Sequence, residues 1–482
     1  MRWSHLSNII GILVIVLGLS MVFPMVCSII YADGSLIPLM ESMGLTLAGG
    51  LAFFLGSRRP DIDYISQREG IAIVALGWTA IGLFGALPFF LGHAVPSFTD
   101  AFFESVSGFT TTGSSVITNI EGVSKSLLFW RSFIQWLGGM GIIVLSIAIL
   151  PFLGVGGMQL FKAEVPSPVP DKLTPRLSES AKILWYVYAG ITVMQVLMLL
   201  LGGMDLFDAV CHAFTTMPTG GFSTKNSSVA HYNSAYIDGV IVVFMIIAGI
   251  NFSLHYQFIR GKTLIFWRDS ECRFFLILTL IVILVVTADI YGSLYETLGQ
   301  AFRYASFQVV SILTTTGYAT ADYELWPGLS QMLLAVCMFV GASAGSTGGG
   351  VKCVRVMVCF KYCYRELFTL AHPRGVAQVK INGVVISNEV LRSIMGFLAL
   401  YIGLFVICSI AIAAMGLDMV SAFGAVAACI GNIGPGFGTV GPVDNFAHIP
   451  MAGKWLLSWC MLLGRLELYT VIILFAPEFW RK

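Results

Sequence analysis

The feature that most constrains this chain is a series of apolar runs, each about 20 residues long. A helix of that length crosses the ~30 Å hydrocarbon core of a bilayer. Only 11% of the 482 residues are charged and the mean hydropathy is +0.85, whereas soluble domains carry about 25% charged residues. The sequence predicts an all-α multi-pass membrane protein with ten spans, at residues 9–30, 36–56, 70–92, 127–151, 181–203, 236–258, 273–292, 327–345, 393–415 and 455–476.

The distribution of Lys and Arg predicts the orientation of these spans, because cytoplasmic loops carry the excess of positive charge. With the N-terminus in the cytoplasm, 21 of the 27 basic residues fall on the cytoplasmic side and five on the opposite side, and Arg465 lies within a span. The first apolar run is too long for a signal peptide and lacks a small-residue cleavage site, so it is interpreted as a membrane anchor. We therefore expect both termini in the cytoplasm.

Four segments on the outer side repeat one pattern, a short apolar helix followed by Gly, Thr or Asn. Copies one and three agree at eight of thirteen aligned positions, including all three threonines of TTTG. Copy four has the same spacing between Ala422 and Gly434, whereas copy two is expected to carry an insertion around Met217 and Pro218. Such self-similarity indicates internal repeats. The copies read DAFFESVSGFTTTGSS from Asp100, DAVCHAFTTMPTGGFS from Asp208, YASFQVVSILTTTGYAT from Tyr304 and SAFGAVAACIGNIGPGFG from Ser421.

A helix of ~10 residues is too short to cross the membrane, so each copy is expected to enter from the outer face and turn back. Non-helical backbone at membrane depth is tolerated only where it is buried in protein or lines a watery cavity. We therefore predict two leading transmembrane helices and four parallel repeats of span, re-entrant pore half-helix with filter loop, and span, around one central pore. The predicted parts are residues 1–69 (leading helices), 70–155, 156–260, 261–355 (with an intramembrane loop) and 356–482 (with a cytoplasmic linker).

The chemistry of the repeated loops favours a cation. The C-terminal end of each half-helix carries partial negative charge, Gly allows unusual backbone turns, and rings of oxygen atoms coordinate dehydrated alkali ions. A single TTTG could merely end a helix, but four matched copies favour the pore. A metal enzyme is not predicted: the closest cysteines, Cys353, Cys359 and Cys363, have no histidine at zinc-ligand spacing, and no pair of nucleophile and base is evident.

Together with GASAGSTGGGVK from Gly341 and LLGRLELYT from Leu462, these features resemble the membrane subunits (TrkH/TrkG) of bacterial Trk-type potassium uptake systems, in the Trk/Ktr/HKT superfamily. The resemblance covers essentially the whole chain and implies potassium uptake across the bacterial inner membrane. In plant relatives a Ser at the first filter glycine accompanies sodium selectivity, and here that position is Gly113. The filter residues it implies are Thr111, Thr112, Gly113, Thr219, Gly220, Thr315, Thr316, Gly317, Asn432, Ile433 and Gly434, with Gly436 as a competing fourth glycine.

A gate is expected below this filter. When the central glycines Gly139, Gly249, Gly341 and Gly464 are aligned, the next residues are Met140, Ile250, Ala342 and Arg465, of which only Arg465 is charged. A charge within a span normally faces a cavity or a partner, so Arg465 either lines the pore or pairs with an acid such as Glu467. The Gly/Ser stretch nearby disfavours a regular helix and does not match the phosphate-binding GxxxxGK[ST] motif. With Arg465, the predicted gate comprises Gly341, Gly345, Ser346, Thr347, Gly348, Gly349 and Gly350.

The resemblance also implies partners that composition cannot show. These are a cytosolic nucleotide-binding regulatory subunit of TrkA type, which would hold NAD or ATP/ADP, and a second copy of this chain as a homodimer. The chain itself is expected to contact the lipid bilayer, to bind no cofactor other than transported K⁺, and to bind no nucleic acid. The alternative function is a cation-coupled secondary transporter, a K⁺/H⁺ or K⁺/Na⁺ symporter with a midplane site. Such folds often have inverted repeats, whereas the repeats here are parallel, and this favours the pore.

Overall fold

The computed structural model describes residues 3–56, 67–148 and 177–480 and is almost entirely helical in these ranges. Besides the end of the predicted span 127–151, two parts of the predictions fall outside them. One is the predicted boundary at 155/156. The other is a set of eight basic residues used to orient the chain, Arg2, Arg58, Arg59, Lys162, Lys172, Arg176, Arg481 and Lys482.

The leading part is a layer of long apolar helices that packs against the first repeat. Helix α1 (Trp3–Ser20) continues into α2 (Val22–Tyr31), and α3 (Leu36–Leu55) runs back along α1. The two backbones approach closely where Gly11 meets Gly50, because a Cβ on Gly11 would contact the carbonyl oxygen of Gly50. Small residues of this kind permit tight helix packing in membranes. Large apolar side chains such as Ile30 remain exposed on the outer face, as expected of a surface that contacts lipid.

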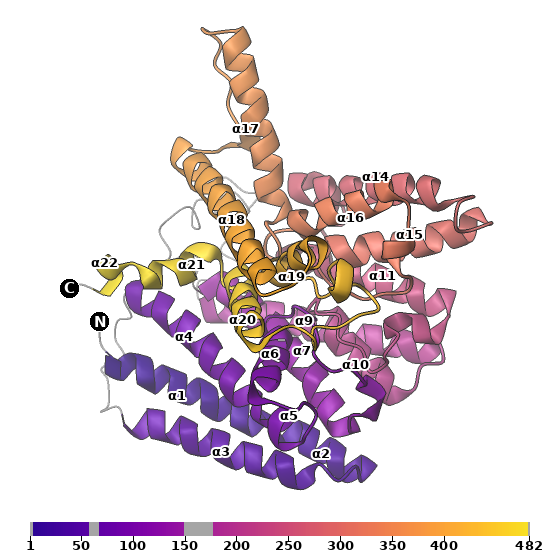
Figure 1. Ribbon diagram of the computed structural model, residues 1–482. Helices are drawn as coiled ribbons and strands as arrows, with labels where there is room; N and C mark the ends of the chain where they lie inside the picture. Colours follow the sequence, from indigo (N-terminus) through magenta and orange to yellow (C-terminus); the bar gives the residue numbers. More distant parts are fainter. Residues whose placement is uncertain (1–2, 57–66, 149–176, 481–482) are drawn as a thin grey trace.

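Four units follow, and each contains a half-helix between two spans or partial spans (Figure 1). Unit 1 comprises α4 (Gln67–Gly85), α5 (Leu87–Leu91), half-helix α6 (Phe98–Phe109), η1 (Ile120–Gly122) and α7 (Lys125–Ala148). Unit 2 comprises α9 (Leu177–Leu201), half-helix α10 (Leu206–Thr216), η2 (Ser228–Tyr232), α11 (Ala235–Gly249) and α12 (Phe252–Ile259). Unit 3 comprises α13 (Ile265–Arg268), α14 (Ser270–Ile290), half-helix α15 (Leu298–Leu313), η3 (Tyr323–Leu325), α16 (Gly328–Val340) and α17 (Cys353–Ala371). A hairpin of β1 (Lys380–Ile381) and β2 (Val384–Val385) leads to unit 4, which comprises α18 (Asn388–Ala414), half-helix α19 (Met419–Gly431), η4 (Gly438–Val440), α20 (Met451–Arg465), α21 (Leu468–Ile472), η5 (Ile473–Phe475) and α22 (Pro477–Trp480).

The units are arranged in a closed ring. In each unit the helix after the half-helix packs against the half-helix of the next unit: α7 contacts α10, α11 contacts α15, α16 contacts α19, and α20 contacts α6. Because the fourth unit returns to the first, the four half-helices surround one axis. This is the parallel arrangement expected from the repeats.

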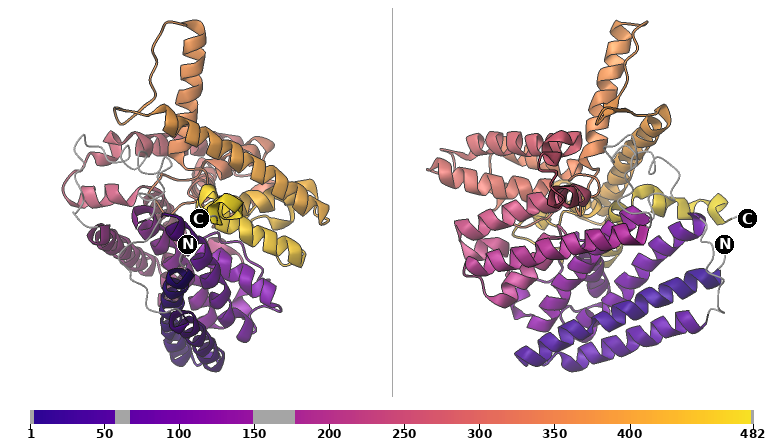
Figure 2. Two further views of the ribbon diagram at one scale, coloured as in Figure 1. Left: turned by 90° about the vertical axis from the view of Figure 1, so that its left-hand side faces the viewer. Right: turned by 180° about the vertical axis from the view of Figure 1, so that it is seen from behind.

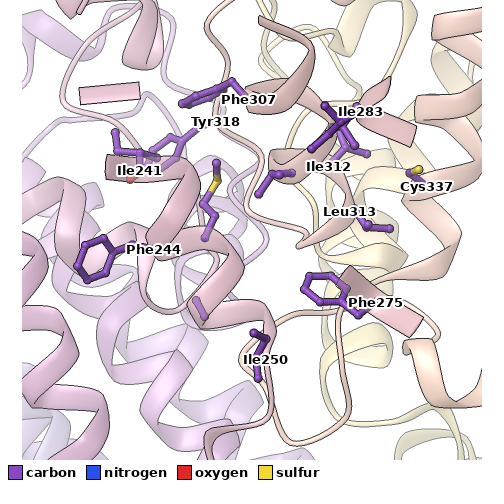
Figure 3. Packing of buried hydrophobic residues seen from close by; sticks show 14 of the residues in the cluster. Ile241, Phe244, Ile250, Phe275, Ile283, Phe307, Ile312, Leu313, Tyr318 and Cys337 are labelled. Carbon is purple, nitrogen blue, oxygen red and sulfur yellow. The ribbon is translucent and has the colours of Figure 1, made fainter. Parts of the chain in front are cut away.

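The half-helices are buried in protein, as the membrane requires of chain that turns back at this depth. Figure 3 shows the packing around α15, where Ile312 and Leu313 at its C-terminal end lie among side chains of neighbouring helices, including Ile283 of α14. Both Ile312 and Leu313 are fully buried. The half-helix therefore exposes no backbone to lipid at its inner end.

Two expected spans are broken helices. The run 236–258 divides into α11 and α12, which are bent by 101°, and the run 455–476 divides at Glu467, whose φ is +66°. Asn251 lies at the first break, and Arg465 and Glu467 lie at the second, but each run is apolar on average, so hydropathy averaged over the run does not reveal the breaks. Among the described residues, six helices are long and apolar enough to cross a membrane, or seven if the bent pair counts as one span.

Helix α17 leaves the bundle and projects from one side of the molecule, as the views of Figures 1 and 2 agree. Its first turns, the β-hairpin and the start of α18 share a small apolar core that includes Val358, Ile381 and Leu391. The hairpin pairs Lys380 with Val385 in antiparallel register. This core anchors α17 directly after the glycine-rich stretch of unit 3.

Candidate functional site

The four segments that follow the half-helices, here called return loops 1 to 4 (residues 110–113, 218–221, 314–317 and 431–434), have the same backbone conformation. One residue near the start of each loop has a left-handed φ, and so does a glycine two residues later. The first position has φ of +52° at Thr111, +56° at Thr219, +62° at Thr315 and +53° at Asn432. The second has φ of +86° at Gly113, +72° at Gly221, +81° at Gly317 and +103° at Gly434.

The residue between these two positions donates the same hydrogen bond in every loop, from its amide to the carbonyl oxygen five residues earlier. These bonds are Thr112 N to Ser107 O at 2.8 Å, Gly220 N to Thr215 O at 2.8 Å, Thr316 N to Ser311 O at 2.8 Å and Ile433 N to Ala428 O at 2.9 Å. The spacing from half-helix to glycine is therefore equal in all four loops.

This geometry corrects the predicted register of loop 2. No insertion is present: Pro218 takes the place of Thr110, and Gly221 rather than Gly220 matches Gly113. The sequence concealed this because Pro218 replaces the first threonine and two glycines stand in succession. In loop 4 the matching glycine is Gly434, whereas Gly436 packs against Gly424 of its own half-helix.

The matched glycines bring the four loops into contact around the axis. A Cβ on Gly113, Gly221 or Gly317 would collide with a carbonyl oxygen of the next loop, and a Cβ on Gly434 would make a tight contact of 3.0 Å, so the left-handed glycines permit this approach. The pairs are Gly113 with Gly220 O, Gly221 with Thr316 O, Gly317 with Ile433 O and Gly434 with Thr112 O. These four carbonyl oxygens come from equivalent positions, and they form a ring that closes from unit 4 to unit 1.

Hydroxyl groups of the TTTG motifs hold the shape of loops 1 and 3. The hydroxyls of Thr110 and Thr112 lie 2.7 Å apart, and those of Thr314 and Thr316 lie 2.8 Å apart. Loop 4 joins loop 1 through the Asn432 amide, whose Nδ2 donates to Thr112 Oγ1 at 2.9 Å. Two buried oxygens of the site, Thr111 Oγ1 and Asn432 Oδ1, have no hydrogen-bond partner within the described chain.

An ion pair that the sequence analysis missed supports loops 1 and 2 from behind. Arg131 Nε donates to Glu104 Oε1 at 2.6 Å, and both side chains are buried. Glu104 also accepts the amide of Val116 at 2.9 Å, while Arg131 Nη1 donates to Ser223 O at 2.9 Å. The pair thus joins the segments that follow both loops. The sequence did contain a signal for this site. The positions equivalent to Glu104 in units 2 and 3 are also polar, with His212 and Gln308.

Further contacts join every pair of neighbouring units. Each connects a half-helix or return segment of one unit to the adjacent unit, and most involve a charged or amide side chain. The contacts are Gln135 Nε2 to Gly220 O at 2.7 Å between units 1 and 2, Arg303 Nε to Asp238 Oδ2 at 2.7 Å between units 2 and 3, Tyr323 Oη to Gly436 O at 2.7 Å between units 3 and 4, and Lys454 Nζ to Asp100 Oδ1 at 2.6 Å between units 4 and 1.

The glycine-rich loop of unit 3 (residues 341–352) lies against the inner ends of three return loops. The amide of Gly349 donates to Thr315 Oγ1 at 2.7 Å, and Thr347 Oγ1 donates to Met217 O at 2.9 Å. A Cβ on Gly349 would also meet Gly431 O at the end of α19. The loop therefore contacts the chain of units 2, 3 and 4 at the level where the half-helices end.

Arg465 is a buried cation that contacts the same loop. Only 4% of the residue is exposed, and Nη1 donates to Thr347 O at 2.6 Å. The ion pair considered with Glu467 is not formed, because Glu467 binds Arg355 at 2.7 Å. Arg465 Nε and Nη2 have no hydrogen-bond partner in the part of the chain that is described.

The residue of unit 1 that is equivalent to Arg465 also differs from the predicted one. A Cβ on Gly138 would meet Phe109 O, and a Cβ on Gly464 would meet Ile430 O. These carbonyls occupy equivalent positions, so Gly138 matches Gly464 and Gly139, rather than Met140, matches Arg465. Neither Gly139 nor Met140 is charged, so Arg465 has no charged counterpart in unit 1 in either alignment.

A carboxylate that the sequence analysis did not consider holds both ends of the glycine-rich loop. Glu271 Oε1, at the start of α14, accepts the amide of Ala344 at 2.7 Å and that of Val354 at 3.1 Å. Glu271 is 5% exposed. No motif distinguished this residue, because it follows an ordinary helix N-cap, Asp269.

Comparison with known proteins gives one consistent result. The family model TrkH, described as a cation transport protein, matches residues 57–482. The chain is 42% identical to the Trk system potassium uptake protein TrkH of Halomonas elongata and 36% identical to TrkG of Escherichia coli, over the full length of each. The crystal structure of the potassium transporter TrkH from Vibrio parahaemolyticus covers the whole chain with a TM-score of 0.92 and 38% identity.

Proposed function

Because this chain belongs to the TrkH family of cation transport proteins, we propose that it takes up K⁺ across the bacterial inner membrane through a channel-like pore. The observation that carries the proposal is the closed ring of four carbonyl oxygens, from Thr112, Gly220, Thr316 and Ile433, each against the glycine of a neighbouring loop. A ring of carbonyl oxygens replaces the hydration shell of an alkali ion.

Two further features favour a cation at this ring. The half-helices end beside it, so their partially negative C-terminal ends face the ion. Each loop supplies one matched glycine, Gly113, Gly221, Gly317 or Gly434, instead of the longer TVGYG stretch of tetrameric potassium channels. We therefore expect fewer stacked coordination sites and a preference for K⁺ over Na⁺ that is real but modest.

The gate in this proposal is the glycine-rich loop together with Arg465. The loop lies below the carbonyl ring, and Arg465 adds a buried positive charge against it. A fixed cation near the ion path raises the barrier to K⁺. Control would come from a cytosolic nucleotide-binding subunit of TrkA type, the pore would assemble as a homodimer, and both termini would be cytoplasmic.

A measurement of reversal potentials tests the pore. The purified protein is placed in a planar bilayer with K⁺ on one side and Na⁺ on the other. A pore predicts single-protein conductance and a reversal potential shifted toward that of K⁺. Saturable transport with fixed stoichiometry to H⁺ or Na⁺, and no conductance, would instead identify the symporter.

A further inference from the structure

The residue that follows the matched glycine of each return loop contacts the preceding unit. These four residues, Ser114, Phe222, Tyr318 and Pro435, are here called the collar. Their contacts differ in chemistry but occur at equivalent places. Ser114 Oγ donates to Gly434 O at 2.8 Å, the guanidinium of Arg131 lies 3.5 Å from the centre of the Phe222 ring, Tyr318 Oη donates to His212 O at 3.1 Å, and a Cβ on Gly317 would meet Pro435 Cδ.

The collar closes every junction of the carbonyl ring. Each collar residue stands two positions after a ring carbonyl and contacts the unit whose glycine faces that carbonyl. Loop 3 is an example: Thr316 O lies against Gly221 of unit 2, and Tyr318 binds the half-helix of the same unit. The contact at the carbonyl and the contact at the collar therefore hold the same two backbones together.

Tyr318 is bound most extensively to the neighbouring unit. Its hydroxyl oxygen lies 2.5 Å from Thr215 Oγ1 and accepts from Thr216 Oγ1 at 3.3 Å. Both partners, like His212, belong to the last turns of α10. The residue is fully buried, and its ring belongs to the same apolar cluster as Ile241 of α11 (Figure 3). The hydroxyl and the ring are thus both anchored in unit 2.

We infer that the collar sets the spacing of the carbonyl ring, and that Tyr318 is a positioning residue that determines the preference for K⁺ over Na⁺. The inference rests on the proposed function, because it takes the ring as the K⁺ site. Na⁺ is the smaller ion, so the carbonyl oxygens that replace its hydration shell must move closer together. A ring whose neighbouring backbones are tied by buried contacts resists this movement, whereas a looser ring accepts both ions.

Removal of one oxygen atom tests the role of Tyr318. Tyr318→Phe deletes the hydroxyl and its bonds to unit 2 but keeps the ring, so the fold should persist and K⁺ should still be conducted. The reversal potential is measured in a planar bilayer with K⁺ on one side and Na⁺ on the other. The K⁺/Na⁺ permeability ratio should fall about fivefold, as expected for the net loss of one hydrogen bond.

Unit 3 also supplies the matched control. Tyr323 is fully buried like Tyr318, and its hydroxyl also reaches a neighbouring unit, where it donates to Gly436 O at 2.7 Å. Gly436 stands beyond the collar residue of its loop. Tyr323→Phe should therefore lower the melting temperature about as much as Tyr318→Phe does and leave the permeability ratio unchanged. An equal fall of the ratio in both variants would refute a special role for Tyr318.

A partner variant tests whether the effect passes through unit 2. Thr215→Val removes the hydroxyl closest to that of Tyr318 and should also lower the permeability ratio, by about twofold to fivefold. The double variant should have the same ratio as Tyr318→Phe alone, because both changes remove one contact and are not independent. Effects that multiply would show that the two residues act separately, and this would overturn the inference. If Tyr318→Phe does not fold, an unchanged ratio in Thr215→Val would overturn it as well.

The outcomes separate the inference from the function on which it rests. If the unsubstituted protein prefers K⁺ and Tyr318→Phe keeps the same permeability ratio, the collar is refuted and the pore stands. If the unsubstituted protein shows no conductance, the pore is refuted and the inference with it.

Discussion

Units 1 and 3 are the two most similar copies at the return loop, and their differences lie elsewhere. Both carry TTTG, both pair the first and third threonine hydroxyls, and both use a serine of the half-helix to bind a return-segment carbonyl. Ser107 Oγ donates to Ser114 O at 2.6 Å, and Ser311 Oγ donates to Tyr318 O at 2.7 Å. The local structure of the loop therefore follows from its local sequence.

The surroundings of the two loops are not alike. Behind loop 1 a buried ion pair, Glu104 with Arg131, connects to unit 2. Behind loop 3 the equivalent residue is neutral, and Gln308 Nε2 donates to Ala321 O at 2.8 Å. Below loop 1 the helix α7 is continuous, whereas below loop 3 the helix α16 ends at Val340 and the glycine-rich loop follows.

This contrast shows how one repeated unit can serve two purposes. The carbonyl ring needs four equal backbones, so the loops are alike. The helices below loops 2, 3 and 4 all break, at Ile250, Gly341 and Glu467, but only in unit 3 does a glycine-rich loop follow the break. The five predictions that follow test this division, from the largest expected free-energy change to the smallest.

Removal of Arg131 should cause the largest loss of stability. Arg131→Gln leaves the Glu104 carboxylate buried and unpaired, and breaking a buried pair in this way costs about 3–5 kcal/mol. In unit 3, Gln308→Ala, at the position equivalent to Glu104, removes one neutral hydrogen bond and should cost about 1 kcal/mol. Thermal unfolding in detergent measures both, and equal losses would show that the ion pair gives unit 1 no special support.

Replacement of Arg465 should increase K⁺ flux. At ~6 Å and an effective dielectric constant near 20, two unit charges repel by roughly 3 kcal/mol. Arg465→Ala should therefore raise flux by up to about a hundredfold, and Arg465→Lys should stay near the unsubstituted protein. Flux and melting temperature are measured together, because lower stability without a gain in flux would remove Arg465 from the ion path.

The matched glycines should respond alike in units 1 and 3. Gly113→Ser and Gly317→Ser each place a side chain in a left-handed conformation against a carbonyl of the ring, a strain of about 1–3 kcal/mol. If this strain distorts the K⁺ site, the ratio of K⁺ to Na⁺ permeability should fall roughly tenfold in each variant.

Unit 2 supplies the test of register. Gly221→Ser should match the other two, because its Cβ would meet Thr316 O, whereas Gly220→Ser would meet the side chain of Gln135, which can move. A larger loss of selectivity for Gly220→Ser than for Gly221→Ser would instead support the alignment predicted from the sequence, in which Gly220 matches Gly113.

The smallest effect is expected at Glu271. Glu271→Gln keeps the size of the side chain but weakens two charge-assisted hydrogen bonds to the ends of the glycine-rich loop. A loss of about 1 kcal/mol should raise basal Rb⁺ flux several-fold. Glu389→Gln, at an exposed carboxylate in the first turn of α18, is the control and should leave flux unchanged. Equal flux in both variants would mean that Glu271 does not restrain the loop.

Much of the fold was predictable, whereas the neighbours of each site residue were not. The all-α membrane architecture with repeated units and the family were predicted from apolar runs and from TTTG, and both are confirmed. The register of loop 2 was wrong because Pro218 and two adjacent glycines admit more than one alignment. The partner of Arg465 was open because Glu467 is near in sequence but binds Arg355 instead.

The sequence alone determined features set by local composition: the apolar helical segments, their repetition and the presence of re-entrant turns. Hydropathy and glycine act over a few residues, so they can be recognised without the fold. Only the tertiary structure decided how the return loops and the glycine-rich loop meet. Asn432 bonds to Thr112 across 320 residues, and Arg465 bonds to Thr347 across 118 residues. Such contacts depend on how whole units pack, and no local pattern of apolar or polar residues specifies them.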